Sequence, residues 1–423
     1  MNNIKYKIIF YHNKPFFGKF YIDTNKLIIN NNYLSLCYTP GVGYISKLIY
    51  KDFYNIYKYT IKSNLVAVLS NGTAVLGLGF LGPLASKSVM EGKSILFKKF
   101  ADINSFDLEI FELNSNNLIH IISSLEVTFG GINLEDIKSP ECFFIENNLK
   151  SISSIPVFHD DQHGTAICVS SAILNSLKFL KKNIFNIKIV VLGAGAASLS
   201  SLNLLINLGF VKKNIFVFDS LGLLSKDRNN INIYKKNFIN LENFLLLKDF
   251  NLNFDLILGC SKPNSVNNKL LNFMFYNSII LFLSNPDPEI LPEIVKFKRF
   301  DSIVFTGRSD YNNQVNNLLC FPFIFRGILD SLSKDINFFI KKKCVFVLSN
   351  LVFINFLEKK FFFKNFILKK ISKEYIIVSP FDKRLIVRIP FIIYKNSVKF
   401  GWCNKYNKNF FFYLKKLSLI NLK

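Results

Sequence analysis

The sequence predicts an α/β protein of two domains, the second built around a doubly wound parallel sheet. A strand, a glycine turn and a helix follow one another at residues 187–208, and strand-like runs at 254–259 and 279–283 extend this pattern. In the first half, two apolar segments each end in a pair of carboxylates. The 423 residues suffice for two substantial cores. We place the domains at 1–162 and 163–423, and expect the segment from about 372 to 423 to pack back on the first domain.

The chain is strongly basic, with a formal net charge of +24. Such an excess can indicate nucleic-acid binding. Here, however, the lysines are scattered among apolar residues, and the composition is skewed toward Lys, Asn, Ile, Phe and Tyr, with only six arginines. This skew is typical of A/T-rich codons. We therefore predict no nucleic-acid partner.

The seven cysteines include no CxxC pair, which argues against a disulfide framework or a structural zinc site. They are typical of free thiols in a reducing compartment. The N-terminus is interrupted by Lys and Asn and does not resemble a signal peptide. The longest apolar run, Cys344–Leu357, is too short to span a bilayer. We predict a cytoplasmic protein with no membrane partner.

Two acidic pairs, Glu135–Asp136 and Asp160–Asp161, each follow an apolar segment. Carboxylates at two strand ends favour a hard divalent cation, so Mg²⁺ or Mn²⁺ bound by both residues of the first pair and one Asp of the second is expected. His159 and His163 have the i, i+4 spacing of a zinc-binding helix. Zinc is disfavoured, because His159 ends a strand-like run and two aspartates follow it.

A second motif lies at residues 187–198, where a strand is followed by a glycine turn and the start of a helix. Gly193 makes the tight turn, Gly195 lets the backbone approach a pyrophosphate, and the small Ser198 allows close packing of helix on strand. Asp219 ends the next strand, about 20 residues on, where a ribose-binding acid belongs. This βαβ context predicts a Rossmann-type domain that binds NAD or NADP. The loop residues that would contact the cofactor are Gly193, Ala194, Gly195, Ala196, Ala197 and Ser198.

A first glycine loop, with Gly77, Gly79 and Gly82, also fits G-x-G-x-x-G. It lacks the same context, because the next strand, which we expect to end near Phe97, offers no acidic ribose ligand. We interpret this loop as a tight turn beside the active site. A purely structural turn is the alternative.

Three further residues could carry chemistry. Tyr38 precedes a Pro-Gly turn, and a phenol there can donate a proton to an enolate carbon. Lys93, if partly buried beside a metal, would have a lowered pKa and could act as a general base. A core tyrosine and an exposed lysine are the alternatives. Asn285 follows a later strand, at the sheet edge where ligands bind, and is expected to contact nicotinamide or substrate.

Together these motifs resemble malic enzyme in its short bacterial form, which oxidises and decarboxylates malate. The resemblance runs from about residue 17 to the end of the chain. Many bacterial relatives carry an additional phosphotransacetylase-like domain, and this chain stops before it. The resemblance implies an N-terminal substrate and metal domain, a Rossmann domain and a homo-oligomer. The matching segments are Tyr38–Val42, Val68–Pro83, Val89–Lys93, Gly130–Asp136, Phe158–Thr165, Gly193–Ala197, Thr306–Asp310 and Glu374–Arg388.

The resemblance also implies a role for individual residues. Tyr38 would protonate the enolpyruvate carbon, and Lys93 would take the proton of the malate hydroxyl. The metal, Mn²⁺ or Mg²⁺, would be held next to Asp160 by Glu135, Asp136 and Asp161. Malate or the nicotinamide would contact Asn285, Asn316 and Asn317.

Two departures from the family pattern leave alternatives open. The family usually has Asp where Asn71 and Phe80 stand in this chain. The leading hypothesis is oxidative decarboxylation of (S)-malate to pyruvate and CO₂ with reduction of NAD or NADP. The alternatives are a degenerate nucleotide-binding relative without turnover and a malolactic or oxaloacetate-decarboxylating variant.

Overall fold

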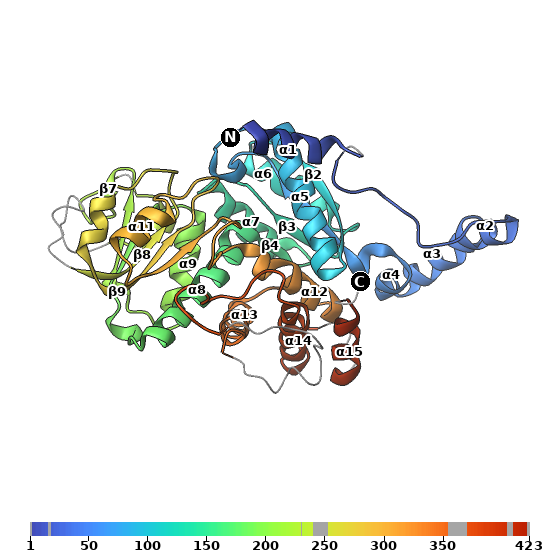
Figure 1. Ribbon diagram of the computed structural model, residues 1–423. Coiled ribbons are helices and arrows are strands. Elements are labelled where there is room, and N and C mark those ends of the chain that lie inside the picture. The colour runs from blue at the N-terminus through green and yellow to red at the C-terminus, as the bar shows by residue number, and fades with distance from the viewer. Residues whose placement is uncertain are drawn as a thin grey trace.

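Two sheets, one in each half of the chain, form the framework of the molecule (Figure 1). The computed structural model describes residues 2–15, 18–229, 231–239, 253–353, 370–403 and 409–420. The first sheet has the strand order β2-β1-β3-β4, and the second has the order β10-β9-β8-β5-β6-β7. The predicted α/β class, with a doubly wound sheet in the second half, is confirmed.

The first sheet is parallel throughout. Its strands are β1 (Leu65–Ser70), β2 (Asn104–Glu109), β3 (Gly131–Leu134) and β4 (Val157–His159). Every residue of β1 is buried, as expected for a central parallel strand covered on both faces. The connecting helices are α5 (Pro83–Ala101), α6 (Ser115–Leu125) and α7 (Glu141–Ile152).

The prediction of a strand that ends near Phe97 is wrong, because this segment forms the helix α5. Pro83 stands at the first helical position, where its missing N–H costs nothing. Met90, Phe97 and Ala101 are all buried, at spacings that place them on one helical face. The helix therefore buries an apolar stripe against the sheet, and it carries Lys93 into the interior on the same side.

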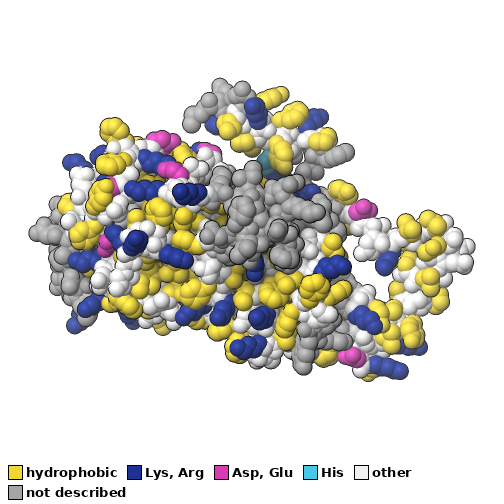
Figure 2. Space-filling model, turned by 60° about the horizontal axis from the view of Figure 1, so that its bottom comes forward, with side chains coloured by type: hydrophobic (Ala, Val, Ile, Leu, Met, Phe, Trp, Pro, Cys, Tyr) yellow, Lys and Arg dark blue, Asp and Glu magenta, His cyan; other side chains and the backbone are white. Residues whose placement is uncertain are grey.

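The N-terminal part of the chain is helical, and part of it stands apart from the body. Helices α2 (Asn31–Cys37) and α3 (Gly41–Lys51) project to one side and form an arm, defined as residues 31–51 (Figure 1). Neither helix has a buried residue, and Figure 2 shows hydrophobic side chains gathered on the arm. The other N-terminal helices are α1 (Asn2–Asn13), η1 (Phe53–Asn55), α4 (Ile56–Tyr59) and η2 (Ile61–Asn64).

The second sheet is parallel except for a short antiparallel strand at one edge. The chain begins in its middle at β5, adds β6 and β7 on one side, and then crosses to β8 on the other. The carboxyl ends of β5 and β8 are therefore a topological switch point, where such sheets bind ligands. The strands are β5 (Ile189–Leu192), β6 (Ile215–Asp219), β7 (Gly222–Leu223), β8 (Phe254–Gly259), β9 (Met274–Phe282) and β10 (Ile303–Thr306).

The helix α8 (Asp160–Leu180) connects the two sheets and packs on both α9 (Ala196–Asn207) and α13 (Phe338–Asn350). The C-terminal part returns toward the first sheet, where Phe381 contacts Phe100 of α5 with 5.6 Å between the ring centroids. The remaining helices are η4 (Ile184–Asn186), η5 (Lys212–Asn214), α10 (Ile233–Lys236), η7 (Asn268–Phe273), α11 (Pro292–Lys298), η8 (Asn317–Leu319), α12 (Phe321–Ser331), α14 (Arg384–Lys399) and α15 (Phe410–Ile420).

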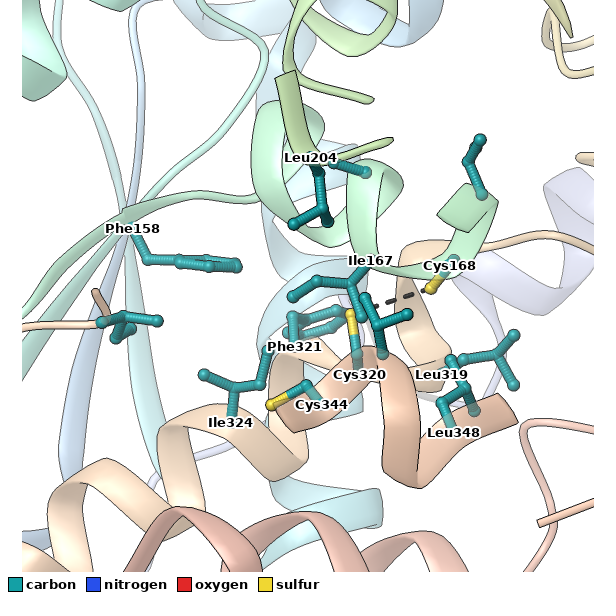
Figure 3. Close-up of a cluster of buried hydrophobic side chains, with 14 of the residues drawn as sticks. Phe158, Ile167, Cys168, Leu204, Leu319, Cys320, Phe321, Ile324, Cys344 and Leu348 are labelled. Atoms are coloured by element: carbon teal, nitrogen blue, oxygen red, sulfur yellow. Dashed lines mark hydrogen bonds between the residues drawn. The ribbon is translucent and has the colours of Figure 1, made fainter. Parts of the chain in front are cut away.

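One contiguous apolar core runs from the first sheet through α8 to the second sheet. Figure 3 shows its centre, where Phe158 of β4, Ile167 of α8, Leu204 of α9 and Phe321 of α12 converge. Each side chain of this size stabilises the fold by about 1.5–3 kcal/mol when fully buried. The core fixes α8, and with it the two aspartates that begin this helix.

The surface of the described residues is basic and partly apolar. On the face drawn in Figure 2, Lys and Arg side chains are spread among hydrophobic ones. Among the described residues, no helix has both the length and the hydrophobicity needed to cross a membrane.

Candidate active site

The centre of the candidate site is Lys93, which α5 carries into a buried position. Its Nζ lies 2.9 Å from Glu135 Oε1 and also donates to Asp160 Oδ2. The phenyl ring of Phe321 covers the ammonium, with 4.1 Å from Nζ to the ring centroid. The alternative of an exposed lysine is therefore wrong, since the side chain is 7% exposed.

The two acidic pairs meet because their strands are neighbours. Leu134 of β3 pairs with His159 of β4 in parallel register, so the residues that follow each strand emerge at the same edge. The backbone N–H of Asp136 donates to Asp161 Oδ2 at 2.9 Å. The first pair thus contacts the second directly, as the sequence predicted for a shared cation.

The first glycine loop lies beside these carboxylates. The backbone N–H of Leu76 donates to Asp136 Oδ1 at 3.3 Å, and that of Ala74 donates to the Asp136 carbonyl at 3.0 Å. A Cβ at Gly72 would come within 2.2 Å of the Gly82 backbone, so the two ends of the loop can meet only at a glycine. The interpretation as a tight turn beside the site agrees with these contacts.

The carboxylates repel one another in a dry environment. Burial, reinforced by Asp161 and Glu135, raises the pKa of Asp136 to about 9. Burial also raises the pKa of Asp160 to about 7, although Lys93 opposes this shift. The site therefore contains more carboxyl groups than a single lysine ammonium can compensate.

The pKa of Lys93 is raised and not lowered. Burial alone would lower it, but the carboxylates of Asp160, Glu135 and Asp161 outweigh burial and stabilise the ammonium. The sequence-based expectation of a lowered pKa assumed a cation nearby. The carboxylates instead keep Lys93 in its charged form.

The donor set fits a divalent cation in chemistry. Asp136 Oδ2 and Asp160 Oδ1 are buried without a hydrogen-bond partner among the described residues. No three described His, Cys, Asp or Glu side chains are already arranged as a metal site. Instead, Lys93 Nζ lies between Glu135 and Asp160. The oxygens present are of the type that Mg²⁺ and Mn²⁺ prefer.

His159 and His163 differ sharply in their surroundings. His163 is engaged away from the carboxylate pairs, with Glu146 Oε2 at 2.9 Å from Nε2 and Lys341 Nζ at 3.1 Å from Nδ1. His159 is fully buried, and neither ring nitrogen has a hydrogen-bond partner in the described structure. Because His159 ends β4 while His163 lies in α8, the two rings do not share a helix face.

The predicted dinucleotide loop joins β5 to α9. Gly193 has φ +100°, and a Cβ there would lie 2.3 Å from the Cys260 carbonyl oxygen, so only glycine fits. At Gly195 an added Cβ would meet nothing within 4 Å. Gly195 also precedes the first turn of α9, whose free N–H groups favour an anion. The loop therefore has the open backbone that pyrophosphate binding needs.

Asp219 ends β6, where the sequence predicted it, but it is already paired. Arg228 donates to both carboxylate oxygens, at 2.8 and 3.1 Å, and Lys235 donates at 2.8 Å. Burial works against ionisation, but these hydrogen bonds prevail and lower the pKa of Asp219 to about 2. Sequence reasoning did not single out either cation. The signal for Arg228 was its rarity, as one of six arginines in a lysine-rich chain.

The three asparagines take different positions. Asn285 follows β9, and its side-chain nitrogen lies 3.0 Å from where a Cβ at Gly307 would stand. Asn317 lies against α8, with its Cβ 2.9 Å from a Cβ built at Gly164. Asn316 uses its side-chain oxygen to cap η8, accepting the Leu318 N–H at 2.9 Å. Two of the three therefore pack against glycines at the edges of the site.

Tyr38 does not lie with Lys93. It connects the two helices of the arm and is 67% exposed, so the alternative of a core tyrosine is wrong. Its backbone N–H donates to the Leu34 carbonyl at 2.9 Å, within the arm. Figure 1 shows the arm pointing away from α5. A single copy of the chain therefore leaves the predicted proton donor apart from the predicted base.

The fold and site together define an α/β protein with two sheets, of which the second is Rossmann-like, and with a buried lysine–carboxylate centre at the edge of the first. Two family models match the chain: "Malic enzyme, N-terminal domain" over residues 18–116 and "Malic enzyme, NAD binding domain" over residues 162–290. An NADP-dependent malic enzyme of Haemophilus influenzae is 50% identical over 81% of this chain and 45% of its own length. The chain thus spans about half of that relative.

Shorter relatives match over most of their length. An NADP-dependent malic enzyme of Halomonas elongata is 45% identical over 81% of this chain and 81% of its own length. The crystal structure of malic enzyme from Pyrococcus horikoshii superposes with a TM-score of 0.85 at 34% identity, covering 99% of this chain and 96% of that one. This chain belongs to the malic enzyme family.

Proposed function

We propose that this chain oxidises (S)-malate with NADP⁺ or NAD⁺ and decarboxylates the product to pyruvate. The observation that carries the proposal is the buried ammonium of Lys93 between Glu135 and Asp160. A second support is the closeness of the two domains at this edge. Asn285 follows β9 of the second sheet, and its carbonyl oxygen lies 3.4 Å from a Cβ built at Gly77 of the first glycine loop. A small acid bound at Lys93 can therefore face a nicotinamide.

In this mechanism Lys93 takes the proton of the malate hydroxyl as hydride leaves C2 for the nicotinamide. The product is a β-keto acid, which loses CO₂ to give an enolate. Phe321 covers the ammonium and excludes water from it. Because the pKa of Lys93 is raised in the carboxylate cluster, a neutral lysine requires a further cation to compensate those carboxylates.

Mg²⁺ or Mn²⁺ fits this requirement. The proposed ligands are Glu135, Asp136 and Asp161, and Asp160 lies next to them. Two observations support this ligand set. Buried carboxylates outnumber ammonium groups at the site, and one oxygen each of Asp136 and Asp160 has no hydrogen-bond partner among the described residues. When bound, such a cation polarises the C2 oxygen and stabilises the enolate.

Tyr38 is proposed to protonate the enolate carbon in the site of a second copy of the chain. The support is its exposure on an arm that projects from the body, together with the apolar side chains exposed beside it. An exposed apolar segment of this kind is typical of an interface. In a symmetric dimer, each arm would carry its tyrosine to the partner's Lys93.

NADP⁺ is the proposed cofactor, with NAD⁺ as the alternative. Arg228 and Lys235 both pair with Asp219, the residue proposed to bind the ribose, and two cations there can hold a 2′-phosphate. The relatives from Haemophilus influenzae and Halomonas elongata are both named NADP-dependent. An acid without cations would instead favour a free ribose 2′-hydroxyl.

The two departures from the family pattern do not fall on the lysine–carboxylate centre. Asn71 and Phe80 both line a cavity of about 220 Å³, together with Thr73, Lys138 and Glu141. Lys93 and Glu135 are not among its lining residues. Phe80 is 59% exposed. We therefore propose a catalytically active protein, and not a degenerate one.

We propose the cytoplasm as its location. All seven cysteines are free, which supports a reducing compartment.

The test is the formation of reduced nicotinamide, followed by its ultraviolet absorbance, with malate, Mn²⁺ and either NADP⁺ or NAD⁺. We expect one pyruvate per reduced cofactor, and a loss of roughly 10²–10⁴ in kcat for Lys93→Ala, as for removal of a general base. Lys99→Ala, an exposed lysine on the same helix, is the matched control. Lactate without net reduced cofactor would indicate malolactic chemistry instead. A folded, Mn²⁺-supplied protein without turnover would contradict the proposal.

A further inference from the structure

Glu289 is a buried carboxylate that bridges the ends of two neighbouring strands. Its side chain is 1% exposed. One oxygen, Oε1, accepts the backbone N–H of Ser261 at 2.7 Å and the Ser261 hydroxyl at 3.3 Å. The other, Oε2, accepts the backbone N–H of Ser284 at 3.2 Å. Ser261 follows β8 and Ser284 follows β9, so a single side chain joins both loops.

The space for this carboxylate is created by a glycine. A Cβ at Gly259, the last residue of β8, would lie 2.9 Å from Glu289 Cδ and 3.0 Å from Oε1. Both distances are too short for an ordinary contact. Glu289 therefore occupies a position that the backbone keeps open for it, and this argues for a fixed location of its two oxygens.

Each loop that Glu289 holds also touches a residue expected to contact the cofactor. Cys260, next to Ser261, presses its carbonyl oxygen against Gly193, as the 2.3 Å to an added Cβ indicates. Asn285, next to Ser284, packs its side-chain amide against Gly307. Cys260, which contacts the phosphate loop, and Asn285 thus each stand next to a residue whose backbone N–H donates to Glu289.

We propose that Glu289 is a positioning residue for the dinucleotide, holding the Cys260–Ser261 loop and Asn285 in the arrangement that binds it. This inference rests on the proposed function, because it requires a dinucleotide at the second sheet. Glu289 does not touch the cofactor and acts through the two loops. A carboxylate suits the role, since both of its oxygens accept an N–H without demanding a donor in return.

Glu289→Gln is the sharpest variant, because it keeps the size of the side chain but replaces one acceptor by an NH₂ group. That group would face an N–H donor, so one of the two loops loses its hydrogen bond. Glu293→Gln is the matched control, since Glu293 lies four residues further on, is exposed on α11 and contacts only Tyr311 among the hydrogen bonds described. Glu289→Asp keeps the charge but is one methylene too short to reach both loops.

The measurement is the Kd of NADPH and of NADH, from the change in nicotinamide fluorescence on titration into the full-length protein. Melting temperatures are recorded in parallel. We expect Glu289→Gln to weaken binding about ten-fold, which corresponds to about 1.4 kcal/mol, and Glu293→Gln to bind like the wild type. A purely structural role would lower the melting temperature while leaving the Kd of the folded protein unchanged.

The outcomes separate this inference from the proposed function. If the wild type binds dinucleotide and folded Glu289→Gln binds equally well, only the role of Glu289 is overturned. If the wild type binds neither NADPH nor NADH, the proposed function fails as well. Should Glu289→Gln not fold, Glu289→Asp decides the question: weaker binding supports the role, and unchanged binding overturns it.

Discussion

The missing side chain of Gly164 makes room for the carboxylate of Asp160, one turn earlier in α8. A Cβ at position 164 would lie 1.9 Å from Asp160 Oδ1. The same Cβ would lie 2.9 Å from the Cβ of Asn317. Because Asp160 also accepts a hydrogen bond from Lys93, Gly164 determines where three elements meet: α5, α8 and η8.

Gly164→Ala is therefore expected to displace Asp160 from Lys93 and to lower kcat by about 10²-fold, the scale of a 1 Å misplacement in an active site. Gly92→Ala is the matched control, since a Cβ at Gly92 would meet nothing within 4 Å on α5. This control should stabilise the protein by about 0.5–1 kcal/mol, because alanine favours a helix more than glycine does. Steady-state kinetics and thermal unfolding of both variants test the prediction. Equal activity of the two alanine variants would contradict it.

The pairing of Asp219 predicts a pH-dependent contribution to stability. Its folded-state pKa is lowered from 3.8 to about 2, so the unfolded chain binds the proton more readily. The stabilisation is therefore fully present above about pH 4 and is lost as the pH falls toward 2. Asp219→Asn should be less stable than the wild type at pH 6, with the difference shrinking in acid.

Chemical denaturation between pH 6 and pH 2 measures this difference. Asp227→Asn, at an exposed carboxylate beside Arg228, provides the control and should change the free energy of unfolding at pH 6 much less than Asp219→Asn does. A constant difference between Asp219→Asn and wild type across the range would show that the ion pairs do not stabilise the fold.

Arg228 and Lys235 should determine the choice between the two dinucleotides. Removing a hydrogen bond to a charged group costs about 1.5–3 kcal/mol, so Arg228→Ala should raise the KM for NADP⁺ by ten-fold or more. The KM for NAD⁺, which lacks the 2′-phosphate, should change much less, because Asp219 remains available to the ribose. Lys235→Ala should have the same sign. Parallel loss with both cofactors would indicate that the cations only support the loop.

Sharing of the site between two copies can be tested by complementation. Tyr38→Phe and Lys93→Ala are each expected to be inactive as pure proteins. After mixing and reassembly, a hybrid dimer would contain one site with both residues intact, and random pairing should restore about a quarter of the wild-type activity. If Tyr38 acted on its own copy, the mixture would remain inactive. Analytical ultracentrifugation establishes whether the dimer forms.

Much of the site was readable from the sequence because its residues are close in the chain or follow strands. Glu135–Asp136 and Asp160–Asp161 each end an apolar run, and parallel strands end at a common edge. Gly193 was recognisable because a tight turn before a phosphate-binding helix requires glycine. The βαβ pattern around it also determined the class of the second domain. Local periodicity failed at Phe97, where a buried helix and a buried strand give similar apolar runs.

Only the tertiary structure decided which residues distant in sequence contact one another. The sequence contains Lys93 and its carboxylates, but the packing of α5 against the neighbouring strands brings them together and raises the pKa of the lysine. It contains Asp219, but the fold pairs it with Arg228 and Lys235. It contains Tyr38, but the fold leaves it on an exposed arm. Sequence patterns report local geometry, whereas charge compensation and access depend on neighbours that only the folded chain supplies.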